Sequence, residues 1–390
     1  MAEIPPYPLY NRTYLLYRVS PLHHGDAPLL HERSLRTHAK RLREQLKGDS
    51  VRGVEVDFAG TEDALPNLGP LEECSWDMIG DEDAWIDRHR HLVDPEASQL
   101  STAMAAGQAR GVEVSLEYEK QSYNALLLRD PGVTASPEAF TSLPLLLVKM
   151  PAAIRDIFLN YLRTSFDAHV APLRLPSAFI TSSLETYFRH LSASASTQTI
   201  QDVIRQVQVQ LAFPNATTLL RHLDVTIAGQ DVPGFVNRGK SLRDGKEKPF
   251  TAAFSTYLNK HLALDMSHPK VHISRITCGS FALGTDRLKL NAPDISVDPE
   301  NSSMEEESAG QRAVEELYRS LVREATGTGK FLSEELVADV STPSSTASNK
   351  AGRRKRAVST TAAGNAKTKR SKARGKENGS RPGDDEMVDV

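Results

Sequence analysis

Apolar and polar residues alternate most regularly between residues 205 and 213, where every second side chain from Val207 to Phe213 is apolar. Such alternation predicts a β-strand with one buried face, because successive side chains of a strand point to opposite sides of the sheet. Shorter apolar runs bounded by glycine, proline or polar turns predict further strands. The predicted strands cover residues 14–19, 52–56, 111–118, 122–128, 144–150, 205–213, 223–227, 271–276, 279–283 and 287–290.

Helical periodicity is clearest in residues 34–47, whose apolar side chains recur at intervals of three or four. Ser34 is the predicted N-cap of this helix, and Gly48 is the predicted residue just beyond its C-terminus. The strands and helices do not follow the strand–helix–strand alternation of a parallel sheet, so the predicted fold class is α+β. Further helices are predicted at residues 151–165, 176–191, 249–264, 311–325 and 331–340.

Composition and pattern together divide the chain into three regions. Residues 1–293 form the predicted α+β body, in which residues 60–108 are expected to be an acidic, irregular insertion pinned by two tryptophans. Residues 294–340 are predicted to be an acidic linker that carries the last two helices. Residues 341–390 are dominated by small and basic side chains and are predicted to be a disordered tail, since they could not bury an apolar core.

The charge of the 390-residue chain is nearly balanced overall, at −3, but it is segregated along the sequence. Residues 350–390 hold 12 basic and 5 acidic side chains, whereas the preceding 349 residues hold 35 basic and 45 acidic ones. The two cysteines exclude a disulfide framework and a four-cysteine zinc site. No signal peptide and no apolar run long enough for a membrane span is recognisable. We therefore expect a cytosolic or nuclear protein with no membrane association.

No catalytic, cofactor-binding or metal-binding constellation is recognisable in the sequence. The run Gly327-Thr-Gly-Lys330 resembles a phosphate-binding loop, but Glu324 stands where the first glycine is required. Phe331 occupies the position at which serine or threonine would bind magnesium. The paired histidines lack neighbouring cysteine or carboxylate ligands. We expect no catalytic residues, no cofactor, no bound metal and no small-molecule substrate.

Two basic clusters in the tail are spaced like a bipartite nuclear import signal. Eleven positive charges and no acid lie between Lys350 and Lys376, which is enough to bind duplex DNA through counterion release. Import alone, and import combined with DNA binding, are both open interpretations. The run Lys376-Glu-Asn378 resembles a recognition motif for cell-cycle ubiquitination. The predicted import residues are Arg353, Arg354, Lys355, Arg356, Lys367, Lys369, Arg370 and Lys372.

Two basic groups in the body are candidates for contact with DNA phosphates. One lies in residues 237–248, which are predicted to form a loop, and the other follows the apolar stripe of the helix at 34–47. For the helix, the alternative is an ordinary solvated face. The candidate DNA-binding residues are Arg238, Lys240, Arg243, Lys246 and Lys248 in the loop, and Arg36, Lys40, Arg43 and Lys47 in the helix.

Segments near both ends of the body carry a family resemblance. The N-terminal segments are Leu9-Tyr10-Asn11, residues 14–25 (YLLYRVSPLHHG), residues 34–43 (SLRTHAKRLR) and Arg52-Gly-Val54. The C-terminal segments are Pro249-Phe250, Tyr257-Leu258, His261, residues 273–281 (ISRITCGSF) and Lys289-Leu290. With these segments the body resembles the fungal members of the centromere protein L (CENP-L) family of the inner kinetochore. The resemblance spans residues 7–291 and leaves out the insertion and the tail.

The resemblance implies curved, mostly antiparallel sheets with helices packed on them, and a non-enzymatic nuclear subunit of the centromere and kinetochore. CENP-L proteins pair with CENP-N through their C-terminal portion. This heterodimer joins other inner-kinetochore subunits on CENP-A chromatin, where it can line a DNA-holding channel. The strands within residues 271–290 are the dimerisation candidate, because an exposed sheet edge offers unpaired backbone groups; an internal sheet position is the alternative. The candidate partner-binding residues are Val271, Ile273, Arg275, Phe281, Leu283 and Lys289.

Two functions follow from these observations. The first is a kinetochore subunit that pairs with a CENP-N-like partner and helps attach the kinetochore to CENP-A chromatin, including its centromeric nucleosome or DNA, for chromosome segregation. The second is a general nuclear chromatin- or DNA-binding protein that acts mainly through its basic tail. An enzyme of unrecognised class is the third alternative.

Overall fold

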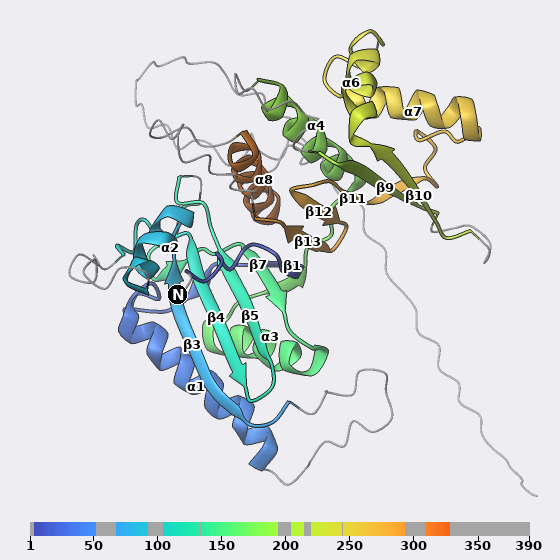
Figure 1. Ribbon diagram of the computed structural model, residues 1–390. Coiled ribbons are helices and arrows are strands. Elements are labelled where there is room, and N and C mark those ends of the chain that lie inside the picture. Colours follow the sequence, from blue (N-terminus) through green and yellow to red (C-terminus); the bar gives the residue numbers. More distant parts are fainter. Residues whose placement is uncertain are drawn as a thin grey trace, which may run out of the picture. The chain divides into compact units, whose positions relative to one another are not determined.

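The computed structural model shows an antiparallel sheet with helices packed on both of its faces (Figure 1). It describes residues 4–51, 68–92, 104–132, 134–193, 204–213, 220–243, 245–292 and 309–327, all of which belong to the unit Met1–Val340. The helices of the described residues are α1 (Glu32–Val51), α2 (Glu82–His89), α3 (Ala152–Phe166), α4 (Ser177–Ala193), α6 (Val232–Lys240), α7 (Pro249–Leu262) and α8 (Ala309–Thr326). The strands are β1 (Thr13–Val19), β2 (Leu22–His23), β3 (Leu71–Ile79), β4 (Gly111–Tyr118), β5 (Ser122–Leu128), β6 (Phe140–Thr141), β7 (Leu145–Lys149), β8 (Val170–Pro172), β9 (Gln206–Ala212), β10 (His222–Ala228), β11 (His272–Thr277), β12 (Phe281–Gly284) and β13 (Arg287–Leu290).

One large sheet runs in the order β10-β9-β11-β12-β13-β1-β7-β5-β4-β3, and β8 pairs with β1 beside this path. Neighbouring strands in this order are antiparallel. Strands β2 and β6 form a separate two-stranded sheet. The predicted α+β class with a mostly antiparallel sheet is therefore confirmed.

Strand β1 joins the two halves of the sheet, although it is the first strand of the chain. Its residues Thr13–Leu15 pair with β13, and its residues Leu15–Arg18 pair with β7. The N-terminal strand thus bonds at once to the C-terminal hairpin β12–β13 and to the middle of the chain. Such pairing between distant segments cannot be read from local periodicity.

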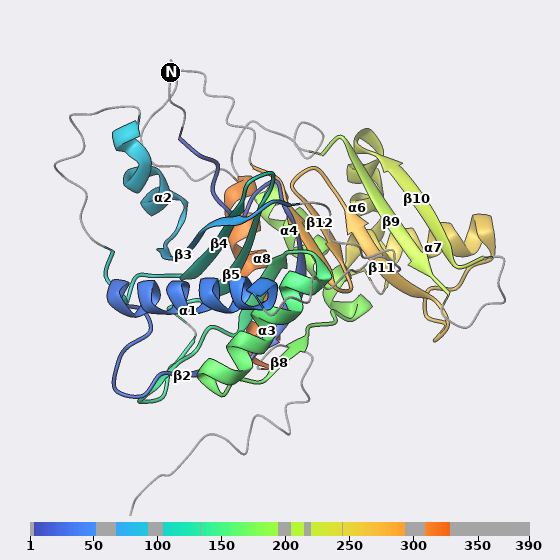
Figure 2. The same cartoon turned by 90° about the horizontal axis from the view of Figure 1, so that it is seen from below.

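Strand β7 explains why its sequence is apolar without alternation. Leu145 and Leu147 belong to one hydrophobic cluster, and Leu146 and Val148 belong to the other. All four side chains are at most 1% exposed, because helices cover both faces of this part of the sheet. Helices α1 and α3 contribute to the second cluster, and α4 and α8 contribute to the first (Figures 1 and 2).

Strand β9 shows the opposite case, a strand with one buried face. Val207, Val209 and Leu211 are at most 1% exposed, while the glutamines between them are half-buried or exposed. The alternation in residues 205–213 therefore predicts both the strand and its orientation. Most other predicted strands and helices of the body are confirmed, with ends shifted by a few residues.

The region expected to be an irregular insertion contains regular elements, which corrects that expectation for its described part. Residues Leu71–Ile79 form β3, and residues Glu82–His89 form α2. Trp76 of β3 is 4% exposed and packs at ring-centroid distances of 6.4 and 6.0 Å from Phe158 and Tyr161 of α3. Acidic residues between the buried positions hide the strand pattern in the sequence. The remainder of 60–108 lies outside the described residues, except for residues 68–70, 80–81, 90–92 and 104–108.

Two helix boundaries also differ from the prediction, and some predictions cannot be compared. Helix α1 begins at Glu32, two residues before the predicted N-cap Ser34, and continues beyond Gly48 to Val51. The predicted strand at 52–56 and the predicted helix at 331–340 lie outside the described residues.

Helix α8 packs on the body although it follows the segment expected to be a linker. Leu321 and Val322 are at most 1% exposed and lie in the same cluster as the core of β7 and α4. Arg110, beside β4, forms a two-pronged ion pair with Glu315 of α8 at 2.7 and 3.0 Å. The Arg110 guanidinium also lies 5.3 Å from the ring centroid of Tyr318. The body therefore includes an element from beyond residue 293.

Candidate interaction surfaces

The strands predicted to bind a partner lie inside the sheet. Strand β11 lies between β9 and β12, β12 between β11 and β13, and β13 between β12 and β1. Ile273, Phe281 and Leu283 are at most 4% exposed. The expected exposed edge at residues 271–290 is therefore wrong, because neighbouring strands pair with both edges of all three strands.

The other predicted partner-binding residues retain some contact with solvent. Arg275 is exposed, and Lys289 and Val271 are half-buried. Whether these residues contact a partner stays a prediction, but a strand added at β11–β13 does not explain such a contact.

Strand β10 is one of the two ends of the sheet, and none of the described strands pairs with its outer edge. Outside the strands proper, Phe213 N–H donates to Arg221 O at 3.0 Å and Gly229 N–H donates to Arg205 O at 2.8 Å. In an antiparallel pair, hydrogen-bonded and non-hydrogen-bonded residue pairs alternate along the strands. Together with the register of β9 and β10, these bonds place the backbone groups of His222, Asp224 and Thr226 on the outer edge. No other residue that the structure describes hydrogen-bonds to these groups.

Strand β3, at the other end of the sheet, is protected. The carbonyl oxygen of Glu72 accepts a hydrogen bond from the Arg43 guanidinium of α1. The carbonyl oxygen of Met78 accepts one from Arg88 of α2 at 3.1 Å. Charged side chains that cover edge groups in this way oppose the addition of another strand. The open edge at β10 is thus the better candidate for strand pairing with a partner.

The basic group at residues 237–248 is only partly a loop, which corrects the prediction. Arg238 and Lys240 lie on α6, whose buried residues recur at helical spacing. The glycines in this short segment conceal its helical pattern. A turn then carries the chain from α6 to α7, and a Cβ atom at Gly239 would overlap the carbonyl oxygen of Pro249. Gly239 therefore permits the close approach that places the remaining basic residues.

Four of the five cations in this group are exposed, and Lys248 is half-buried. The Arg238 guanidinium lies 4.7 Å from the ring centroid of Phe235, a cation–π contact that limits its freedom without neutralising it. Among the described residues, none of the five cations forms an ion pair. The four exposed cations therefore present to solvent positive charge that no described acid pairs with.

A groove between α4, α7 and β11 brings together residues from both predicted sites. We call it the α4–α7 groove; its volume is about 640 Å³. Arg243 and Lys248 of the basic group line it together with Val271 and Ile273 of the predicted partner site. The remaining lining residues are Ser177, Ala178, Thr181, Leu242, Thr251, Ala252, Ser255, Thr256, Met266 and Ser267.

Beneath this groove, a buried carboxylate anchors the start of α7. Glu185 of α4 is 4% exposed and accepts hydrogen bonds from Thr251 N–H at 2.7 Å, Thr251 Oγ1 at 2.8 Å and Phe250 N–H at 3.4 Å. Burial raises the pKa of Glu185, while these hydrogen bonds oppose the rise. The sequence pattern did not identify this residue, because its partner lies 66 positions away.

The basic ridge of α1 does not present four equivalent cations. Arg36 is exposed but forms an ion pair with Glu32, and Lys40 is exposed. Arg43 is half-buried and donates to the backbone of β3, so its guanidinium fastens the helix to the sheet edge. Lys47 is exposed at the far end of the helix. Only part of this ridge could follow a nucleic-acid backbone.

The tail predictions cannot be compared with the structure. The eight predicted import residues and the Lys376-Glu-Asn378 motif lie outside the described residues.

The part of the chain that the structure describes contains no cluster of three or more histidine, cysteine, aspartate or glutamate side chains suited to a metal ion. Burial raises the pKa of both cysteine thiols, Cys74 and Cys278, to about 12, so each is a neutral thiol at physiological pH. No helix among the described residues is long and apolar enough to cross a membrane.

An open sheet edge, a groove and a set of unneutralised cations are features of a protein that binds other macromolecules. The model of the centromere protein L (CENP-L) family matches residues 8–326, so the chain belongs to this family. The match includes α8, in agreement with its packing on the body. A search among curated proteins finds no match. Membership implies a role at the centromere and kinetochore, and the family consists of structural proteins.

Proposed function

We propose that the protein is a non-enzymatic inner-kinetochore subunit that pairs with a CENP-N-like partner through the open edge of β10. The outward backbone groups of His222, Asp224 and Thr226 are the single observation that carries this proposal. A partner strand can bond to such groups and extend the sheet, with main-chain hydrogen bonds supplying affinity. This site replaces β11–β13, whose edges are occupied within the molecule.

Replacement of Thr226 by proline tests this pairing. Thr226→Pro removes an outward N–H without removing a bond to β9, so we expect the chain to fold and its affinity for the CENP-N-like partner to fall at least tenfold. Light scattering after size-exclusion chromatography, followed by a binding titration, measures the heterodimer. Thr226→Ala is the matched control, because it changes the side chain and keeps the N–H. Unchanged affinity of a folded Thr226→Pro variant would contradict the proposal.

Attachment to CENP-A chromatin forms the second part of the proposal. Arg238, Lys240 and Lys246 are exposed and carry charge that no described acid neutralises, so they support contact with DNA phosphates. In the full chain, combined Arg238→Ala and Lys240→Ala should lower the slope of log affinity against log salt by about 2. Arg90→Ala, which removes an exposed cation paired with Asp87, is the control. An unchanged slope would exclude the α6 cations from the interface.

The basic tail supports a second candidate function, that of a general chromatin-binding protein. Its 11 positive charges from Lys350 to Lys376 are uninterrupted by acids. Replacement of residues 341–390 by an unrelated import signal separates the two functions. Retained centromere localisation would favour the body, and loss of chromatin association would favour the tail.

A further inference from the structure

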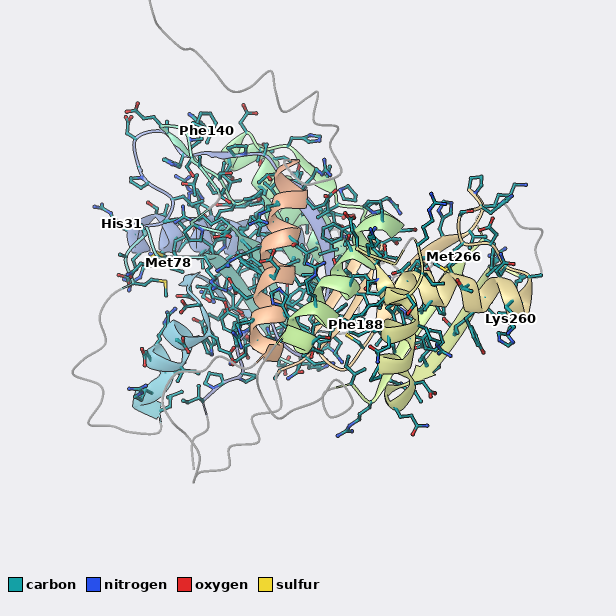
Figure 3. All side chains as sticks on the ribbon, turned by 90° about the horizontal axis from the view of Figure 1, so that it is seen from above. His31, Met78, Phe140, Phe188, Lys260 and Met266 are labelled. Carbon is teal, nitrogen blue, oxygen red and sulfur yellow. The ribbon has the colours of Figure 1, made fainter. Side chains whose placement is uncertain are left out.

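The α4–α7 groove has a polarity that distinguishes it from a simple apolar depression. Leu242, Met266, Val271 and Ile273 give it an apolar floor, and Arg243 and Lys248 add positive charge. Ala178, Arg243, Thr256 and Ser267 are exposed, so the groove is open to solvent. Figure 3 labels Met266 on the segment between α7 and β11, and Lys260 near the C-terminal end of α7. The volume of about 640 Å³ lies in the range of sites that take a small molecule or a few residues.

The hydroxyl groups of this groove are mostly hydrogen-bond acceptors toward any occupant. Thr256 donates its proton to Ala252 O at 3.0 Å, and Thr181 donates to carbonyl oxygens within α4. Ser177 donates to Ile273 O at 3.1 Å, and Thr251 donates to Glu185. A hydroxyl that has committed its only proton still offers lone pairs. The walls therefore suit an occupant with N–H donors, such as a peptide backbone.

The charge of the groove selects an anionic occupant. Among the lining residues that the structure describes there is no aspartate or glutamate, and neither Arg243 nor Lys248 forms a salt bridge with a described residue. Asp265, beside the groove, accepts hydrogen bonds from Ser267, and the charge of Lys248 opposes the rise that burial causes in the pKa of Glu185. The carboxylate of Glu185 lies nearby, but it is buried and occupied by the first turn of α7. An arginine or lysine in this position can form a charge-assisted hydrogen bond with a carboxylate or phosphate.

We propose that the α4–α7 groove binds a short peptide segment of a partner protein in which acidic side chains stand beside apolar ones. The apolar side chains cover Leu242, Met266 and Val271, and the acidic ones meet Arg243 and Lys248. Backbone N–H groups of the peptide donate to the hydroxyl walls. Duplex DNA is the less suitable occupant, because it offers phosphate acceptors to walls that are acceptors themselves and leaves the apolar floor uncovered.

The site is separate from the β10 edge, so the two proposals can fail independently. The β10 proposal rests on backbone groups at the end of the sheet, whereas this one rests on side chains of α4, α7 and β11. If the chain pairs with its CENP-N-like partner but binds no peptide, only the groove proposal is contradicted.

Selection from a displayed library of random twelve-residue peptides on the full chain tests the proposal. We expect enriched peptides to carry aspartate or glutamate next to leucine, isoleucine, valine or phenylalanine. The most enriched peptide is then labelled and titrated by fluorescence anisotropy, beside versions with its acids replaced by lysine or by phosphoserine. Lysine should abolish binding, and phosphoserine should preserve it or strengthen it.

Variants of the chain assign the binding to the groove. Thr256→Trp fills the groove from an exposed position, and combined Arg243→Glu and Lys248→Glu reverses its charge; each should weaken the peptide at least tenfold. Lys260→Glu, on the same helix but not among the lining residues of the groove, is the control for reversal of a single exposed charge and should leave affinity unchanged. Thr256→Trp should also leave the affinity for a 20-base-pair DNA duplex unchanged.

Three results would overturn the proposal. They are a selection that enriches no peptides with acidic residues next to apolar ones, an unchanged peptide affinity in the groove variants, and loss of DNA binding in Thr256→Trp. The last result would identify the groove as a nucleic-acid surface. A melting curve for each variant separates loss of binding from loss of folding.

Discussion

His38 shows how one polar side chain can sit in an aromatic environment. Its ring lies 4.5 Å from the ring of Phe166 and 5.8 Å from that of Trp76, measured between centroids, and its Nδ1 is 2.8 Å from the Tyr161 hydroxyl. Burial, together with the charge of Arg41, lowers the pKa of His38 from 6.5 to about 4. The folded state therefore holds a neutral imidazole between α1, α3 and β3.

This shift predicts acid sensitivity that a single substitution should reduce. Stability is full above pH 6.5, where the imidazole is neutral in both states, and falls as the pH drops toward 4, because the unfolded state binds a proton that the folded state does not. His38→Gln keeps a polar group but cannot titrate, so its melting temperature should change less between pH 7 and pH 5 than that of the wild type. Burial raises the pKa values of Glu113 and Glu185, so a fall in pH through their titration favours the folded state, in contrast to His38. Both residues remain in wild type and variant, so their effect is the same in the two proteins. Equal pH slopes in the two proteins would contradict the account.

Two glycines of α6 provide a matched pair for a stability measurement. Gly239→Ala forces a methyl group against the Pro249 carbonyl and should destabilise the protein by about 1–3 kcal/mol. At Gly234, exposed on the same helix, an added Cβ would meet only the flexible Arg238 guanidinium at 4.0 Å, so Gly234→Ala should stabilise by about 0.5–1 kcal/mol. Urea unfolding measures both changes. A neutral Gly239→Ala would show that the turn into α7 can shift freely.

At the scale of elements, the sequence predicts those strands and helices whose buried residues recur at a regular spacing. The alternating side chains of β9 and the continuous apolar run of β7 were both identifiable as strands. Strand β3 was missed because Glu72, Glu73 and Asp77 interrupt its buried positions. Helix α6 was missed because glycines and cations within it resemble a loop. The sequence pattern fails to predict an element when charged residues at a sheet edge, or glycines needed for close packing, interrupt its buried positions.

The sequence predicts α8 as a helix, but it does not predict that this helix packs on the body and contributes to its core. The ion pair between Arg110 and Glu315 has side chains that are 21% and 26% exposed, so it is well shielded from water. Arg110→Ala should destabilise the protein by about 2 kcal/mol, since it removes two charge-assisted hydrogen bonds and leaves Glu315 without them. In a double-mutant cycle with Glu315→Ala, the second substitution should cost less once the first is present. Additive effects would show that the pair does not couple α8 to β4.

At the scale of the whole molecule, the sequence predicted the fold class and the family resemblance but not which strands end the sheet. Position in a sheet depends on pairings such as β1 with β13, which join residues more than 270 positions apart. The sequence therefore predicts the partner site at β11–β13, whereas β10 is the strand whose outer edge no described strand covers. The basic residues at 238–248 were identified from charge alone, but their division between the α6 surface and the groove depends on the turn at Gly239.

The most direct test of the central claim is affinity purification of the chain from nuclear extract, followed by mass spectrometry. Residues 341–390 are replaced by an unrelated import signal, so that only the body can recruit partners. We expect this protein to recover a CENP-N-like subunit with other inner-kinetochore subunits, and Thr226→Pro in the same background to lose the CENP-N-like subunit. Recovery of no centromere subunit by the body, or equal recovery by the folded Thr226→Pro variant, would contradict the account.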